Sequence, residues 1–134
     1  MITITYQTTS EGLPKMFDVF AYKDKNGKSP VDEYLRELAA KSDKDSRIKL
    51  NKIYEYIKYL SESGQQAGEP YIKHLDGDIW ELRPIRDRFL YAAWDGNSFI
   101  LLHHFIKKTQ KTPPREIKQA KRNLTDYRER SKKQ

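Results

Sequence analysis

The chain has 134 residues, of which 34% are charged and 37% hydrophobic, and its formal net charge is +7. This length predicts one domain with a modest core, and the absence of cysteine excludes disulfides and thiolate metal sites. No apolar run approaches the roughly 20 residues that span a bilayer, so the composition favours a soluble cytoplasmic protein without a membrane partner.

The first fifteen residues differ in character from those that follow. Residues 7–14 are polar and turn-like, whereas a strand pattern covers residues 17–23 and ends at a turn over residues 24–27. We therefore predict that residues 1–15 are an N-terminal extension, a cloning remnant or an alternative-start segment. The folded domain is then expected over residues 16–130, with a basic tail over residues 131–134.

Two consecutive helices are predicted next. Ser29 is a suitable N-cap, and Pro30 fits the first helical turn. The second helix begins between Asp43 and Ser46 and ends at Gly64. Because only a short link separates the two, we expect an antiparallel helix hairpin. The inner faces consist of Val31, Tyr34, Leu35 and Leu38 in the first helix and of Leu50, Ile53, Ile57 and Leu60 in the second.

Strands dominate the remainder of the predicted fold. Residues 71–75 could form a short extended piece, and three strands are expected over residues 79–83, 88–94 and 99–107. The last two are apolar on both faces, which predicts central strands, and residues 95–98 join them as a tight hairpin.

Residues 112–116 (Thr-Pro-Pro-Arg-Glu) are expected to cap a final helix that frays after Tyr127, with Ile117, Ala120, Leu124 and Tyr127 on its inner face. The predicted order is β-α-α-β-β-β-α. It indicates an α+β fold with a mostly antiparallel sheet, an N-terminal helix hairpin and a C-terminal helix.

Positive charge is concentrated in the C-terminal part of the chain. From Arg83 onward there are 14 Lys and Arg against 5 Asp and Glu, a net charge of +9. Residues 1–82 hold 12 against 14, a net charge of −2. A basic surface beside an almost neutral half indicates a polyanionic partner, and nucleic acid is the commonest one.

Several kinds of site are missing from the sequence. The six glycines are scattered and form no phosphate-binding loop, and no serine lies in a known nucleophile signature. His74, His103 and His104 lack metal-ligand spacing, and neighbouring strand residues such as His103 and His104 point to opposite faces. For an enzyme we therefore expect metal-free chemistry on a polyanion, without a cofactor.

The basic region contains candidate functional side chains, each with a structural alternative. Strand alternation places Glu81 and Arg83 on one face, where a surface ion pair is the plain interpretation. Exposed loop charge is the corresponding interpretation for Arg86 and Arg88. His103 and His104 are either hydrogen-bonded core residues or proton-transfer groups.

Lysines gather where the last strand ends. Lys107, Lys108 and Lys111 form a solvated basic loop, or they stabilise the charge that develops on a phosphate in its transition state. RNA allows such a reaction without a metal, because its 2′-hydroxyl can attack the adjacent phosphate. Arg, Lys, His and Tyr side chains suffice for it. Tyr91, Trp94 and Phe105 could stack on bases, although core packing suits them better.

Four segments resemble a known family. They are residues 81–84 (Glu-Leu-Arg-Pro), 101–113 (Leu-Leu-His-His-Phe-Ile-Lys-Lys-Thr-Gln-Lys-Thr-Pro), 116–120 (Glu-Ile-Lys-Gln-Ala) and 126–127 (Asp-Tyr). In these residues and their spacing the chain resembles the phage-derived HigB-like toxins of the RelE superfamily. The resemblance runs from about Met16 to Arg130. Residues 72–75 and 79–84 are similar to streptococcal HigB in particular.

The resemblance implies a RelE-like fold and a type II toxin that cuts messenger RNA on the translating ribosome. It also implies a HigA-like helix-turn-helix antitoxin as partner, packed near the helix hairpin or the last helix, with operator DNA bound only through the toxin–antitoxin complex. The implied catalytic residues are Arg83, Arg88, Lys107 and Lys108 for phosphate charge and His103 for proton transfer. Arg86, Lys111, Lys118 and Lys121 are the expected RNA-binding residues. A basic nucleic-acid- or protein-binding module without catalysis is the alternative.

Overall fold

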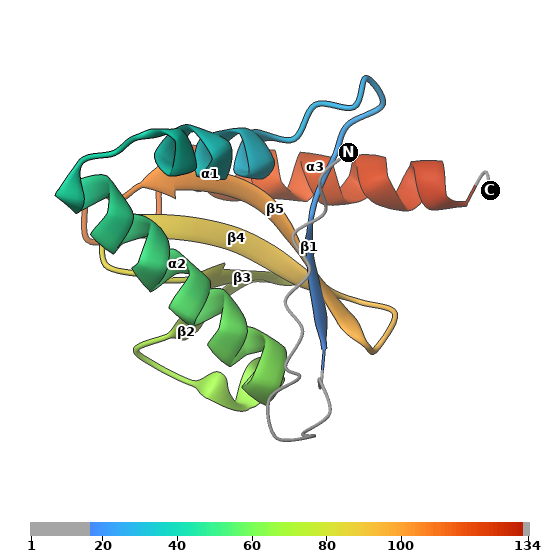
Figure 1. The fold of residues 1–134 in the computed structure, drawn as a ribbon. Coiled ribbons are helices and arrows are strands. Elements are labelled where there is room, and N and C mark those ends of the chain that lie inside the picture. The colour runs from blue at the N-terminus through green and yellow to red at the C-terminus, as the bar shows by residue number, and fades with distance from the viewer. Residues whose placement is uncertain (1–16, 133–134) are drawn as a thin grey trace, which may run out of the picture.

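The structure, a computed structural model, describes residues 17–132 and contains within them three α-helices and one five-stranded sheet (Figure 1). The proposed extension over residues 1–15 and the end of the basic tail lie outside the described residues. The strands are β1 (Asp18–Ala21), β2 (Ile72–Asp76), β3 (Ile79–Leu82), β4 (Asp87–Trp94) and β5 (Ser98–Ile106). Their spatial order is β1-β5-β4-β3-β2, and only β1 and β5 pair in parallel. The expected α+β class and mostly antiparallel sheet are therefore confirmed.

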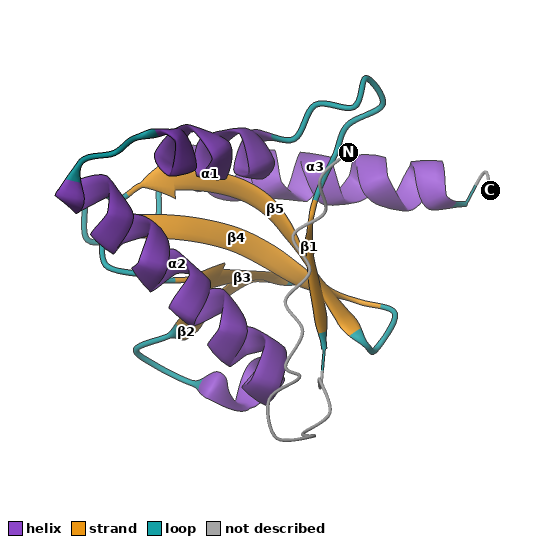
Figure 2. Ribbon diagram, in the orientation of Figure 1, coloured by secondary structure: helices purple, strands orange, loops and turns teal. Residues whose placement is uncertain are grey.

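The helices lie on both sides of this sheet. The helices α1 (Pro30–Ala40) and α2 (Lys44–Ser63) cover one face, and α3 (Pro114–Ser131) covers the other (Figure 2). A short 3-10 helix, η2 (Gly64–Ala67), follows α2. Among residues 17–132, no helix has the length and apolar character needed to cross a membrane.

Local chemistry sets the ends of the first two helices. The Ser29 hydroxyl accepts the backbone N–H of Asp32, with Pro30 in the first turn. The Asp43 carboxylate caps α2 in the same way by accepting the backbone N–H of Ser46 at 2.9 Å. Gly64 ends α2 at a φ of +59°. Both predicted starts and the predicted end are confirmed.

The two central strands pack apolar side chains on both faces, as expected. Phe89 and Phe99 belong to the core under α1 and α2, whereas Leu90 and Ile100 belong to the core under α3. A β-bulge interrupts the pairing of β4 with β5, because Leu90 pairs with His103 but the next residue pairs with Leu101. The bulge leaves one extra residue on β5 and thus resets which side chains face each helix layer.

The structure differs from the expected elements in three details. The extended piece expected over residues 71–75 is a full strand, β2, paired antiparallel with β3, so the sheet has one strand more than the predicted order. The helix α3 continues past Tyr127 to Ser131, because Arg128 pairs with Asp78 and Arg130 donates to the Lys23 carbonyl oxygen. The Thr112 hydroxyl does not cap α3, and instead donates to Glu81 on the sheet.

Candidate nucleic-acid interface

A buried carboxylate lies between two arginines, one directly after β3 and one on β4. Glu81, on β3, is 2% exposed, and its Oε1 atom lies 3.4 Å from Nε of Arg83 and 3.8 Å from Nε of Arg88. The sequence placed Glu81 and Arg83 on one face, and the structure confirms it. Nη1 of Arg83 also lies 3.4 Å from Oε1 of the exposed Glu69. These contacts make Glu81 the centre of the candidate site.

Further cations surround the same carboxylate. Lys73 pairs in register with Glu81 across β2 and β3, and Lys107 and Lys111 come from the segment after β5. All of them line one pocket with Glu81, Arg83 and Arg88. Five cationic side chains therefore line one pocket with a single carboxylate, which leaves this part of the surface strongly positive.

Arg88 does not fit the exposed-loop interpretation. It lies on β4, is 5% exposed, and its Nη1 atom donates to the carbonyl oxygens of Ile85 and Asp87 at 2.9 Å each. Burial lowers the pKa of Arg88, and the nearby charge of Arg83 acts in the same direction while Glu81 opposes it. The structure thus holds a charged guanidinium in place before any ligand binds.

The segment after β5 closes over this pocket. The Thr112 hydroxyl donates to Oε2 of Glu81 at 2.5 Å, and the Thr109 hydroxyl donates to the carbonyl oxygen of Lys111 at 2.7 Å. The enclosed volume is only about 10 Å³. In this arrangement the inner part of the site, including Arg88, is covered by residues 107–112.

Two larger cavities adjoin the closed pocket. One, of about 480 Å³, is lined by Ile85, Arg86, Lys107, Lys108, Thr109 and Gln110. Arg86 is exposed and donates from Nη2 to the carbonyl oxygen of Lys107 at 3.0 Å. The other, of about 470 Å³, shares Lys108 and Thr109 with the first and extends to Tyr34, His104 and Arg115. Shared lining residues connect the three cavities into one cationic track along residues 107–112.

The two histidines of β5 face opposite sides of the sheet, as predicted. Nε2 of His103 lies 2.7 Å from Oε1 of Glu116, at the start of α3, and His103 does not line the pocket of Arg83 and Arg88. Nε2 of His104 lies 2.8 Å from Oδ1 of Asp87 on the α1 side. Each histidine is therefore a hydrogen-bonded partner of a carboxylate.

Sequence reasoning missed the buried carboxylate that His104 contacts. Asp87 is 1% exposed and also accepts a hydrogen bond from the Tyr34 hydroxyl at 2.6 Å, with Nζ of Lys49 at 3.7 Å. Burial alone would raise the pKa of Asp87, but the hydrogen bonds from His104 and Tyr34 and the charge of Lys49 outweigh it, so the pKa is lowered. The signal available in the sequence for this buried carboxylate was an acidic residue between Arg86 and Arg88 at the start of a strand.

The remaining predicted RNA-binding residues lie on α3. Lys118 is exposed there. Nζ of Lys121 lies 2.5 Å from the carboxylate of Asp76, beside a separate cavity that Arg128 also lines. The structure therefore brings Arg86 and Lys111 to the track but leaves Lys118 and Lys121 outside it.

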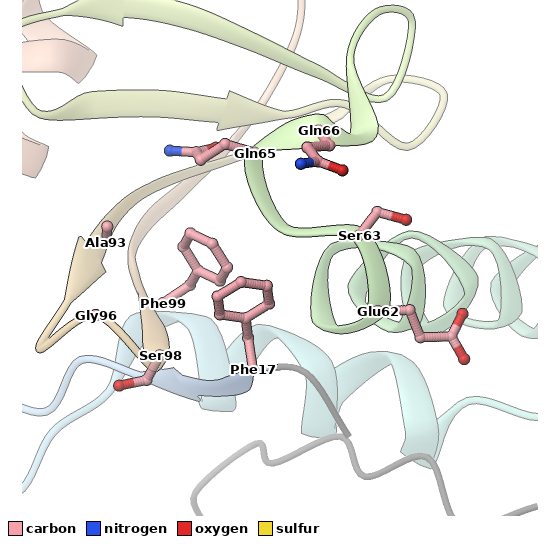
Figure 3. A pocket seen from close by; sticks show the side chains of 9 residues that line it. All are labelled: Phe17, Glu62, Ser63, Gln65, Gln66, Ala93, Gly96, Ser98 and Phe99. Atoms are coloured by element: carbon pink, nitrogen blue, oxygen red, sulfur yellow. The ribbon is translucent and has the colours of Figure 1, made fainter. Parts of the chain in front are cut away.

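A further cavity among the described residues is not part of this track. It measures about 600 Å³ and lies between the end of α2 and the β4–β5 hairpin (Figure 3). The rings of Phe17 and Phe99 lie next to each other there, with centroids 5.1 Å apart, and the described lining residues include Glu62 and two glutamines but no cation. A polyanion has no electrostatic reason to bind at this cavity.

Comparison with known protein families identifies the family of this chain. The family model of the phage-derived protein Gp49-like (DUF891) matches residues 33–125, which is more than half of the chain. The chain belongs to the Gp49-like family. This is a toxin-like family related to RelE/HigB-type modules. No protein of curated function matches the sequence significantly.

The Gp49-like match covers the whole track. It includes β2, β3, β4 and β5 and the first two thirds of α3, and every predicted site residue lies within it. Within residues 17–132, no group of three or more His, Asp and Glu side chains is arranged to hold a metal ion.

Proposed function

We propose that this Gp49-like protein is the toxin of a type II toxin–antitoxin system and acts as a HigB-like, metal-independent endoribonuclease on messenger RNA at the ribosome, in the cytoplasm. The observation that carries the proposal is the pocket around Glu81 with the cationic track beside it. The cations of the pocket come from four different parts of the fold, namely Lys73, Arg83, Arg88, and Lys107 with Lys111. Such convergence suits a phosphate whose charge increases during a reaction.

The reaction is an internal transfer at phosphorus. The 2′-oxygen of the RNA attacks the adjacent phosphorus while the bond from phosphorus to the 5′-oxygen breaks. The products are a 2′,3′-cyclic phosphate and a 5′-hydroxyl, so one proton leaves the 2′-hydroxyl and one reaches the 5′-oxygen. In our proposal Arg83 and Lys107 contact the phosphate oxygens, whose negative charge grows as the fifth bond forms. Arg88 adds a fixed positive charge beneath them.

His103 is the proposed proton acceptor. An ionised carboxylate can only accept hydrogen bonds, so the Nε2–H of His103 is the donor in its hydrogen bond with Glu116. The Nδ1 atom of a neutral His103 is then free of its proton and can take the one from the 2′-hydroxyl. An ammonium group of Lys107 or Lys108 supplies the proton for the 5′-oxygen.

Control of the toxin is proposed to come from a HigA-like helix-turn-helix antitoxin. We expect an acidic or amphipathic segment of it to pack near α1 and α2 or along α3, where Lys118 and Arg122 are exposed. Operator DNA would be bound only through this complex. Backbone hydrogen exchange that slows on neither surface when the antitoxin binds would contradict this placement.

Induced expression tests the activity. In cells that produce the wild-type protein we expect growth arrest and new 5′-hydroxyl ends within messenger RNA. Arg83→Ala and Lys108→Ala should each lower cleavage by about 10²-fold or more, which is the effect of removing one donor that stabilises transition-state charge. Arg47→Ala, at an exposed position of α2 that lines none of the three cavities of the track, is the matched control and should cleave normally.

Two outcomes would contradict the proposal. Intact messages with normal growth would refute the nuclease, and unaltered cleavage by both variants would remove Arg83 and Lys108 from the site. Salt-sensitive RNA binding without new 5′-hydroxyl ends would instead favour the non-catalytic binding module.

A further inference from the structure

Ile85 combines two properties that rarely occur together. Its φ is +55°, a conformation that β-branched residues strongly disfavour, and its side chain is 56% exposed. The backbone N–H of Asp87 donates to the carbonyl oxygen of Pro84 at 3.0 Å, which closes a β-turn with Ile85 at its second position. A positive φ at that position normally selects Gly, Asn or Asp, so turn preferences do not explain an exposed isoleucine there.

The surroundings hold this turn in its strained form. The Ile85 carbonyl oxygen accepts from the buried Arg88 guanidinium, and the Arg86 carbonyl oxygen accepts the backbone N–H of Lys107 at 2.7 Å. Arg86 in turn donates to the Lys107 carbonyl oxygen. Strained residues persist where neighbouring structure fixes them on several sides, and they cluster at functional sites.

The exposed side chain lies where a base would follow a bound phosphate. Ile85 lines the cavity of about 480 Å³ together with Arg86, Lys107 and Lys108, so one wall is apolar and the others are cationic. Pockets of about 300–1,000 Å³ accommodate small organic groups, which leaves room for a nucleobase. Apolar side chains of this kind insert between bases in other nucleic-acid-binding proteins.

We propose that Ile85 is a base-contacting wedge, which packs against one unstacked base of single-stranded RNA while Lys107 and Lys108 hold the neighbouring phosphates. This inference rests on the proposed function, because it assigns the RNA to the same track. The strained turn holds the Ile85 side chain in the same cavity as the cations. Arg88 thereby has a second effect, since it fixes the turn that presents Ile85.

RNA binding without cleavage tests the wedge. The affinity of the full chain is measured at low salt by fluorescence anisotropy for a short single-stranded RNA and for an abasic oligonucleotide with the same backbone charge. We expect the wild type to prefer the intact RNA by about fivefold or more, the lower end of what one stacked base contributes. Ile85→Asn should abolish this preference and leave the abasic affinity unchanged. Lys108→Ala should weaken binding of both.

The variants separate the effect of the Ile85 side chain from the effect of its backbone conformation. Asn tolerates the left-handed conformation, so Ile85→Asn should unfold at the same temperature as the wild type or higher. Ile85→Leu keeps an apolar wedge and should retain the preference. Ile48→Asn, at another exposed isoleucine (48%) that lies on α2, is the matched control and should leave RNA binding unchanged.

The outcomes distinguish the wedge from the nuclease. Equal affinity of the wild type for the two oligonucleotides, binding of neither, or a preference kept by Ile85→Asn would overturn the wedge even if messages are cut in cells. A lost preference in Ile85→Asn and a retained one in Ile85→Leu would support it. That result would stand even if no 5′-hydroxyl ends form, in which case only the nuclease fails.

Discussion

Asp87 is expected to be the most sensitive polar residue of the fold. The Tyr34 hydroxyl and the His104 ring both donate to its Oδ1 atom, and Oδ2 is buried without a hydrogen-bond partner among the described residues. Asp87→Asn keeps the shape and one oxygen but removes the charge. Each hydrogen bond then weakens by about 1 kcal/mol, for a loss of about 2 kcal/mol. Asp87→Ala also leaves both donors unpaired and should cost about 4 kcal/mol.

Urea unfolding measures this loss. With a slope of about 2 kcal/mol/M, the midpoint should fall by about 1 M in Asp87→Asn and by about 2 M in Asp87→Ala. Glu37→Gln, which neutralises an exposed carboxylate on α1, is the control and should change stability by less than about 0.5 kcal/mol. Midpoints of both Asp87 variants within the range of this control would refute the reasoning.

The pH dependence gives an independent check. The folded-state pKa of Asp87 is lowered from its ordinary value of 3.8. Its contribution is therefore fully present above the pKa of the unfolded chain and is lost as the pH falls through the folded-state value. The difference in free energy of unfolding between wild type and Asp87→Asn should consequently shrink below about pH 4. A difference that grows with acidification would contradict the assignment.

Two further predictions concern the end of α2 and the segment after β5. Gly64→Ala should destabilise the fold by about 2 kcal/mol or more, because φ is +59° and the new Cβ would lie 2.6 Å from the Phe17 ring. In the control Gly27→Ala the new Cβ meets no atom within 4 Å, and the cost should be about 1 kcal/mol. Thermal unfolding measures both. Thr112→Val removes the hydrogen bond to Glu81 and should speed backbone amide exchange over residues 107–111, whereas Thr112→Ser keeps the bond. Equal exchange in the two variants would contradict the closure of this segment over the pocket.

Local signals explain why most of the fold could be predicted. Ser29, Asp43 and Gly64 act through backbone groups within four residues, so the sequence alone reveals them. β2 lacked such a signal because its middle residues are exposed at a sheet edge, which erases the apolar alternation. The end of α3 was missed because a distant backbone carbonyl, that of Lys23, helps to hold it.

In the candidate site, too, the sequence reveals only what depends on local pattern. Alternation within one strand brings Glu81 and Arg83 together, and chain proximity places Lys107 and Lys111 near each other. Lys73 could not be identified, because its position depends on the register between β2 and β3. The burial of Arg88 was equally hidden, since it depends on carbonyl groups of a turn whose conformation is unusual for isoleucine.

The covered pocket is compatible with the proposed reactive site because few hydrogen bonds hold it shut. Lys107 exchanges two of them with Arg86, and one, from Thr112 to Glu81, ties the other end of the covering segment to the sheet. A bond of this last kind, to a charged group, contributes about 1.5–3 kcal/mol, so breaking it would cost at most about two orders of magnitude in population. Arg88 needs no rearrangement after opening, because backbone carbonyls rather than Glu81 fix its guanidinium. In the proposed reaction, a phosphate that enters would then replace Glu81 as the partner of Arg83 while the buried charge of Arg88 stays in place.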